Sequence, residues 1–366
     1  FADEMPVIMR QPSGMLSGIR TCCRNVIITS SMPSEPKHRA GSSASSLGSE
    51  SRSGSNGHKS EATSDLDAFL GRWKEVAGDV ESTLVAAIDR LGDDCPARLR
   101  EAIAYSLLAP GKRLRPILCV FACEAVGGDS QAALGPAAAL EMIHCYSLIH
   151  DDLPAMDDDD LRRGRPTCHI QFDEATAILA GDALQPLAFE TILRSSLPPQ
   201  AAAEACLALA HAAGSEGMVG GQMDDLLAEK RDSAAMALDE QKRWLDAIHR
   251  RKTGAMIAAS VLMGGIAGGA TTQQRAALGL YGRAIGIAFQ IVDDLLDVES
   301  TAENTGKATG KDSARGKLTF PTVYGIPASR EQARQWVSQA IDAVEPFGEA
   351  AFPLKRLAQY ILDRSN

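Results

Sequence analysis

The chain has 366 residues and a formal net charge of −10, a balance that disfavours a general nucleic-acid-binding surface. Hydrophobic residues make up 45% and charged residues 23%, which excludes a chain that is disordered throughout. Aromatic residues are only 5%, runs of Ala and Leu are common and β-branched stretches are few, so helices are favoured over sheets. We therefore expect an all-α protein that does not bind nucleic acid.

The first 64 residues differ in composition from the rest. Residues 30–65 are rich in Ser, Gly and charge and nearly lack large apolar side chains, so burial cannot offset the entropy cost of ordering them. Residues 1–29 carry arginines at positions 10, 20 and 24 and acids only at positions 3 and 4, which weakly resembles a transit peptide. We expect a disordered extension over residues 1–64 and a cytoplasmic protein. The alternative is a transit peptide and an organelle.

Residues 65–366 follow a helical pattern and predict one large all-α domain. Apolar residues recur every three to four positions, as in the series Phe69, Trp73, Val76, Val80 and Leu84. Gly- or Pro-containing breaks at 92–94, 127–129 and 197–199 predict connections between helices. The longest apolar window, 255–270, is too short to cross a bilayer, so we expect a buried core helix there and no transmembrane segment.

An acidic cluster lies within residues 147–167. Asp151 and Asp152 are followed by four consecutive aspartates at 157–160. Such carboxylates repel one another unless cations neutralise them, and Mg²⁺ typically bridges one or two carboxylates to phosphate oxygens. An EF-hand is excluded because no starting Asp is followed by both Gly at loop position six and Glu at position twelve. A solvated acidic helix end is the alternative for this cluster taken alone.

A second acidic cluster lies in an otherwise apolar helical segment. Asp293 and Asp297 are one turn apart and share a helix face, with Asp294 beside them. Charges in this setting are costly unless they pair, bind a metal or face a solvated cavity. Two such clusters in apolar helices together favour a functional site over two solvated helix ends.

Basic side chains recur near the expected helix ends of this acidic chain. They are Lys112, Arg113, Arg115, Arg162, Arg163, Arg165, Lys252, Lys307, Lys311 and Lys317. Arginine forks and lysine point charges suit a diphosphate, which carboxylates bind only through a cation such as Mg²⁺. The expected substrate is a diphosphate ester, and two sets of basic groups indicate two such substrates.

Several separated motifs along residues 65–366 occur in the order of a known family. They are GKRLRP at 111, DDLPAMDDDDLRRGRPT at 151, LAGDAL at 179, GGQMDDL at 220, KTGA at 252, FQIVDDLLD at 289 and GKATGKDSARGKLTFP at 306. The chain thereby resembles the short-chain trans-isoprenyl (polyprenyl) diphosphate synthases, and most of all the bacterial-type farnesyl diphosphate synthases of that family. The resemblance implies the isoprenoid synthase fold, with helices around a deep central cavity and the two acidic motifs facing each other at its mouth. It also implies a homodimer.

The resemblance further implies where Mg²⁺, three ions in this family, would bind. The ligand positions are Asp151, Asp157, Asp225 and Asp293, with Asp152 and Asp297 supporting. A regular helix would align Asp158 rather than Asp157 with Asp151. Pro154 is expected to distort the helix and restore Asp157, and Asp158 is the substitute.

By the same matching, basic residues would hold two diphosphates. The allylic diphosphate is assigned to Arg162, Lys252 and Lys317, and isopentenyl diphosphate to Lys112, Arg115, His144 and Arg163, with Lys307 as a further substrate-binding residue. His144 precedes Asp151 by seven residues, close to two turns, so both can face one cavity. Without the surrounding motif, a histidine on an apolar helix such as His144 would be interpreted as a buried core residue. The Gly- and Lys-rich stretch 305–317 is expected to close over the site.

The implied reaction ionises the allylic C–O bond, after which isopentenyl diphosphate attacks the allylic cation head-to-tail. The family places the backbone carbonyl of Lys252, with Thr253 and Gln290, next to this cation; Gln290 reads equally well as a core amide. Tyr146, five residues before Asp151, is the family position where an aromatic side chain stops growth at C15. The alternative for Tyr146 is a core aromatic without influence on length.

The expected activity is therefore that of a farnesyl diphosphate synthase. A geranylgeranyl diphosphate synthase, which makes C20, is the alternative enzyme. A non-catalytic subunit of a heteromeric synthase would be expected to have lost one acidic motif. A terpene cyclase needs neither the second motif nor GKRLRP, and an acidic protein that merely binds divalent cations does not explain the spaced Lys and Arg motifs.

Overall fold

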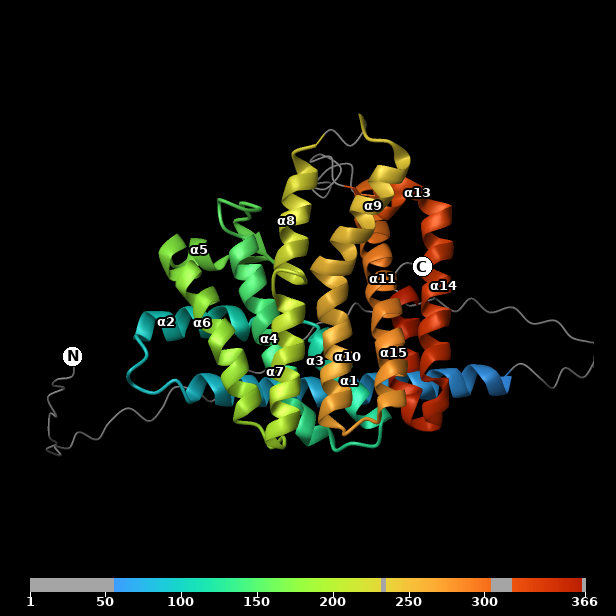
Figure 1. Cartoon of the computed structure of the whole chain (residues 1–366), viewed down its shortest axis with the longest axis horizontal. Helices are drawn as coiled ribbons and strands as arrows, with labels where there is room; N and C mark the ends of the chain where they lie inside the picture. The colour runs from blue at the N-terminus through green and yellow to red at the C-terminus, as the bar shows by residue number, and fades with distance from the viewer. Residues whose placement is uncertain (1–55, 232–234, 304–317, 364–366) are drawn as a thin grey trace, which may run out of the picture. The chain divides into compact units, whose positions relative to one another are not determined.

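The computed structural model describes residues 56–231, 235–303 and 318–363 (Figure 1). The chain divides into two units, 1–54 and 55–366, and the elements below belong to the second. In chain order they begin with α1 Asn56–Asp89, α2 Ala97–Leu107, α3 Leu114–Ala125 and α4 Ser130–Asp151. They continue with β1 Leu161–Arg162, β2 Arg165–Pro166, α5 Cys168–Gln171, α6 Glu174–Leu193, α7 Pro199–Ala213, α8 Met218–Glu229 and α9 Leu238–His249. A π-helix Arg250–Gly254, α10 Ala255–Ala267, α11 Thr272–Glu303, α13 Phe320–Tyr324, α14 Ile326–Val344, a 3₁₀-helix Glu345–Ala351 and α15 Phe352–Asp363 complete them.

The expected all-α class is confirmed. The strands β1 and β2 form one antiparallel pair of two residues each, with Leu161 opposite Pro166 and Arg162 opposite Arg165. Strands this short carry no readable alternation, so the sequence could not indicate them. The helix α1 already begins at Asn56, ahead of residue 65, where the domain was expected to start; the expected extension otherwise lies outside the described residues.

The buried faces of the helices are those that the apolar spacing predicts. In α1, Phe69, Val76, Val80 and Leu84 are buried in the core, and Trp73 is partly buried against it. The expected connections at 92–94, 127–129 and 197–199 all lie outside helices or at a helix start. Pro199 is the first residue of α7, where a proline costs no hydrogen bond.

The helix α10 occupies the middle of the helical packing. It contacts α3, α4, α7 and α11, and most of its side chains are buried, as expected for residues 255–270. In Figure 1, the axes of α10, α11 and α14 are roughly parallel, with α10 and α11 joined at their lower ends, while α1 and α2 lie across them. The C-terminal helices α14 and α15 pack on α11, and α6 packs on α4. This packing brings the C-terminal end of α4, the π-helix and α11 into one region.

The expectation about membrane spans needs one correction. Among the described residues, α4 is long and apolar enough to cross a bilayer by length and composition, although it was not the window singled out above. Of its apolar window, 72% is buried inside the protein, and the helix carries Glu141 and His144. Its contacts with α3 and α6 explain this hydropathy as that of a core helix.

Candidate active site

The first acidic motif forms a turn that folds back onto the end of α4. The helix ends at Asp151, and the backbone N–H of Asp157 donates to the carbonyl of Asp151 at 2.8 Å. The N–H of Asp159 donates to the carbonyl of Asp152 at 3.2 Å. Asp158 lies between them with a left-handed φ of 52° and an exposed side chain. The turn, rather than a distorted continuing helix, brings Asp157 beside Asp151.

Asp151 is the most strongly perturbed carboxyl of this turn. Burial raises its pKa to about 6; Lys252 and Arg162 oppose this shift, and the carboxylates of Asp157 and Asp152 add to it. The mutual effect of Asp151 and Lys252 places the acidic turn and the π-helix close enough to interact electrostatically. An anion held in this way favours a cation at its open side.

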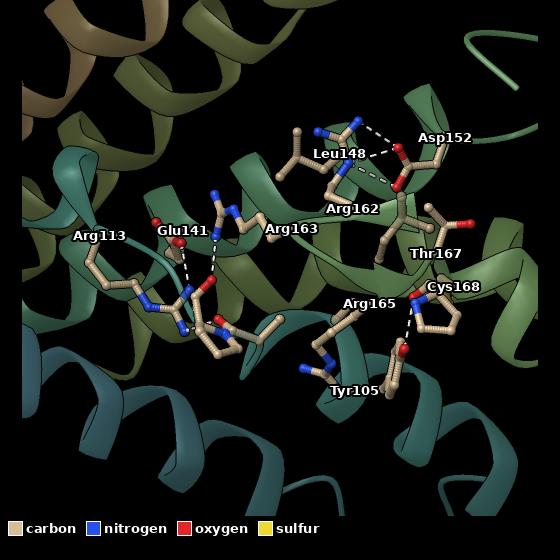
Figure 2. Close-up of a pocket in the computed structure, with 15 residues that line it drawn as sticks. Tyr105, Arg113, Glu141, Leu148, Asp152, Arg162, Arg163, Arg165, Thr167 and Cys168 are labelled. Carbon is tan, nitrogen blue, oxygen red and sulfur yellow. Dashed lines mark hydrogen bonds and ion pairs between the residues drawn. The ribbon is translucent and has the colours of Figure 1, made fainter. Parts of the chain in front are cut away.

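Asp152, unlike Asp151, is paired with an arginine inside the protein. The residue is 3% exposed, and its carboxylate accepts hydrogen bonds from Arg162 Nε at 2.7 Å and 3.0 Å, with a further ion pair to Arg162 Nη2 at 2.5 Å. Figure 2 shows the two side chains facing each other. The expected supporting metal ligand and the expected diphosphate ligand are thus joined, and Asp152 holds Arg162 in place beside Asp151.

A pocket lies between α2, α4 and the β1–β2 pair (Figure 2). At one end, Arg113 is 7% exposed and donates to Glu141 at 2.7 Å and to Glu81 at 2.9 Å. Arg163 donates to the carbonyl of Pro110 at 2.6 Å and so ties the β1–β2 pair to the loop before α3. Arg113, whose guanidinium is paired with two glutamates, is also the arginine of this motif that the family resemblance does not assign to a substrate.

Arg115 and His144 form the second group of polar side chains. Arg115 Nε is buried without a hydrogen-bond partner among the described residues, and burial lowers its pKa. Burial, with Arg115 and Arg163 nearby, holds the pKa of His144 well below its usual value, so the imidazole is neutral at pH 7. Lys112 is exposed and lies in the loop just before α3, the helix that carries Arg115. An unpaired buried guanidinium nitrogen suits an anionic ligand.

The second acidic motif lies on α11, and its three aspartates differ in burial. Asp293 is half-buried and Asp297 is exposed, whereas Asp294 is 6% exposed. Asp294 accepts from Gln290 Nε2 and from the N–H of Phe320, both at 2.9 Å. Asp294 was not among the expected site residues, although its position four residues after Gln290 indicated that the two could meet on one helix face.

The π-helix Arg250–Gly254, which carries Lys252 and Thr253, packs against both α8 and α11. Lys252 Nζ pairs with Asp225 at 2.6 Å, and Arg251 pairs with Asp224 at 2.5 Å. A Cβ at Gly221 would lie 2.2 Å from the backbone nitrogen of Lys252, so only glycine allows this approach of α8. Thr253 is half-buried in the same π-helix. The sequence indicated Lys252 and Asp225 separately, but not their ion pair or the π-helix.

The comparisons with known proteins agree with this geometry. Residues 96–350 match the family model described as polyprenyl synthetase. The chain belongs to the polyprenyl synthetase family. Over 275 residues it is 47% identical to geranylgeranyl pyrophosphate synthase 9, chloroplastic, of Arabidopsis thaliana, covering 74% of this chain and 75% of that one. Over 313 residues it is 43% identical to a dimethylallyltranstransferase of Fischerella ambigua, covering 85% and 87%.

Solved structures show the same fold. A crystal structure of an FPP/GFPP synthase from Zymomonas mobilis matches with a TM-score of 0.71 at 39% identity, covering 81% of this chain and 99% of that one. The expected isoprenoid synthase fold is therefore confirmed, and this polyprenyl synthetase is a prenyltransferase.

The donor set of this polyprenyl synthetase fits Mg²⁺ together with a phosphate-bearing ligand. Among residues 56–231, 235–303 and 318–363, no three His, Cys, Asp or Glu side chains converge on one metal position. Mg²⁺ needs only one or two carboxylates and completes its octahedron with waters and phosphate oxygens. Asp151 and Asp157, adjacent in one turn, supply hard oxygens of this kind. Lys307 and Lys317, expected to bind substrate, lie outside the described residues.

Replacing Asp151 with asparagine should stabilise the metal-free protein. The folded protein binds the proton of Asp151 more tightly than the unfolded chain, because its pKa is about 6 rather than 3.8. This carboxyl therefore lowers the free energy of unfolding as the pH rises from about 4 to 6. Asp151→Asn should raise Tm at pH 7.5 and have a much smaller effect at pH 4, measured by thermal denaturation.

Asp158→Asn, at an exposed carboxylate of the same turn, is the matched control and should leave Tm nearly unchanged at both pH values. Adding Mg²⁺ with inorganic diphosphate should stabilise the wild type more than Asp151→Asn. Equal stabilisation of the two proteins would contradict a metal-binding role for Asp151.

Proposed function

We propose that this polyprenyl synthetase is a Mg²⁺-dependent farnesyl diphosphate synthase. It would condense isopentenyl diphosphate with dimethylallyl diphosphate and then with geranyl diphosphate. The observation that carries the proposal is a pair of cationic groups near one acidic turn. Arg162 and Lys252 lower the pKa of Asp151, and Arg115 and Arg163 lower the pKa of His144. Two diphosphate substrates need two such groups.

Arg162 and Lys252 would hold the allylic diphosphate next to Asp151 and Asp157. Arg162 is oriented for this by its hydrogen bonds to Asp152. Lys252 is held by Asp225, a partner that can share it with an incoming phosphate. Lys317 is proposed as a third cation and Lys307 as a further one. Asp293 and Asp297 on α11, with Asp225 on α8, complete the proposed ligands of Mg²⁺, for which we keep the family count of three ions.

Isopentenyl diphosphate would bind at Arg115, His144, Arg163 and Lys112. The unpaired Nε of Arg115 gains a partner when a phosphate oxygen arrives. The neutral imidazole of His144 can donate one hydrogen bond to a phosphate without adding charge. Arg163 would exchange its bond with the carbonyl of Pro110 for a phosphate.

The proposed reaction needs no protein nucleophile. Mg²⁺, when bound, supplies Lewis-acid withdrawal of charge from the allylic diphosphate. The C–O bond breaks with its electron pair on the diphosphate, and the double bond of isopentenyl diphosphate forms the new C–C bond to the allylic cation. A proton is then lost to the released diphosphate. The carbonyl of Lys252, Thr253 and the amide oxygen of Gln290 would stabilise the cation electrostatically.

The purified chain, incubated with Mg²⁺, isopentenyl diphosphate and dimethylallyl diphosphate, should form farnesyl diphosphate. The product would be measured as farnesol after dephosphorylation. Asp293→Ala should lower the rate by at least about 100-fold, since charge stabilisation of the leaving diphosphate is lost. Absence of any prenyl product from dimethylallyl, geranyl and farnesyl starters would favour the non-catalytic subunit instead.

Tyr146 supports C15 as the product length. Its side chain is 6% exposed, and its ring meets the His150 ring edge-on at 5.8 Å between centroids. Burial and the nearby charge of Asp151 raise its pKa to about 12. We propose that this buried ring on α4 limits the length of the growing chain. A specific observation favours a C20 product: the Arabidopsis relative is named a geranylgeranyl pyrophosphate synthase.

Tyr146→Ala should shift the product from farnesyl to geranylgeranyl diphosphate, because it removes the ring from the α4 wall. Tyr146→Phe keeps the ring and should still give C15. Gas chromatography of the dephosphorylated alcohols measures both. An unchanged product in Tyr146→Ala would return Tyr146 to a packing role, and C20 from the wild type would support the geranylgeranyl synthase.

Assembly and location complete the proposal. Exposed Ile178, Leu179 and Leu193 on α6 support the expected homodimer, which sedimentation velocity of the purified chain would test.

The name of the Arabidopsis relative carries the word chloroplastic, which favours the organelle alternative over the cytoplasm. A fluorescent protein fused to residues 1–64 should then enter an organelle; a cytosolic signal would restore the first expectation.

A further inference from the structure

Asp294, the middle aspartate of the second acidic motif, accepts a hydrogen bond on each of its two carboxylate oxygens. Oδ1 accepts from Gln290 Nε2 and Oδ2 accepts from the N–H of Phe320, each at 2.9 Å. Burial raises its pKa to about 7, against the two hydrogen bonds that favour the charged form. Asp293 and Asp297, on the same helix, are more exposed. The three aspartates therefore have different surroundings.

Asp294 lies where three elements of the site meet. It sits on α11, binds the first residue of α13 and lies 3.9 Å from His249 Nε2 at the end of α9. The rings of His249 and Phe320 are 5.2 Å apart between centroids. His249 directly precedes the π-helix that carries Lys252 and Thr253. Burial lowers the pKa of His249 to about 4, so a neutral imidazole faces Asp294.

The hydrogen bond to Asp294 determines which way the Gln290 amide points. Gln290 Nε2 donates to Oδ1 of Asp294 while the N–H of Phe320 occupies Oδ2, so the NH₂ group of Gln290 is turned toward Asp294 and its carbonyl oxygen takes the opposite position. Within the described part of the chain no donor to that oxygen is recorded. Gln290 thus offers the negative end of its dipole, which suits a cation rather than a diphosphate.

We propose that Asp294 is a positioning residue rather than a Mg²⁺ ligand: it orients Gln290 with its oxygen toward the allylic cation and holds the first residue of α13. The inference rests on the proposed condensation for the role of the Gln290 oxygen. Its other half, the contact with Phe320, concerns the folded chain alone. An amide at position 294 could donate to the Gln290 oxygen and turn the Gln290 amide around.

Asp294→Asn should lower kcat by about 10- to 100-fold, the loss expected when one preorganised dipole is misdirected. KM for both diphosphates and the Mg²⁺ concentration for half-maximal rate should stay within about twofold of wild type, because binding is untouched. The matched control Asp293→Asn should raise the Mg²⁺ requirement. An Mg²⁺ requirement raised equally in Asp294→Asn would overturn the proposal.

A double-mutant cycle tests whether Asp294 acts through Gln290. Gln290→Leu should itself lower kcat at an unchanged Mg²⁺ requirement, and adding Asp294→Asn should cost no more than about twofold further. Multiplying losses would mean that Asp294 acts independently of Gln290. Full kcat in Gln290→Leu would also overturn the proposal, and this variant serves if Asp294→Asn fails to fold.

Hydrogen–deuterium exchange, measured without substrate, tests whether Asp294 protects the backbone amide of Phe320. Asp294→Ala should accelerate exchange in peptides that contain the Phe320 amide, and Asp293→Ala should not. Unchanged exchange in Asp294→Ala would refute the anchoring role. A wild type that exchanges as expected but forms no prenyl product would count against the proposed function, not against this contact.

Discussion

Burial of negative charge among apolar helices is the constraint on which the site depends. Asp152 and Asp294 lie almost fully inside the protein, where an unpaired carboxylate would be costly. The chain satisfies Asp152 with the guanidinium of Arg162, and Asp294 with the neutral N–H groups of Gln290 and Phe320. Asp151 receives no such internal partner in the described residues, and its pKa rises to about 6. Asp151 is therefore the carboxylate of this turn that we propose as a ligand for a cation from outside.

The same distinction separates the basic residues. Arg113 satisfies Glu141 and Glu81 and belongs to the structure of the loop before α3. Arg115, two residues later, keeps a buried nitrogen without a partner in the described chain. Neighbouring arginines of one motif thus differ, because Arg113 is paired inside the protein and Arg115 Nε is left without a partner in the described chain. Removing one partner of a buried ion pair is costly, whereas an unpaired guanidinium gains stability from an anion.

The positions of Lys252 and Thr253 depend on a close approach between two backbones. The π-helix presents Lys252 and Thr253 against α8, and Gly221 permits the contact because it has no Cβ. The pairing of Lys252 with Asp225 then links α8 to the region of Asp151. Family membership, the all-α fold and these contacts all support a prenyltransferase that handles diphosphates between these helices.

The helical class, the buried face of α1 and the two acidic motifs could be predicted from the sequence, because helical periodicity and carboxylate spacing are local properties of the chain. Motif order also indicated the family, which the comparisons confirm. The family resemblance indicated Asp157 and left Asp158 as the substitute, and the tertiary structure shows how Asp157 comes beside Asp151: a turn with backbone hydrogen bonds replaces the expected helix. The tertiary structure alone separated Asp152 and Asp294, which are paired internally, from Asp151. The reason is physical: burial and partners come from residues far apart in sequence, and those set the charge and direction of each side chain.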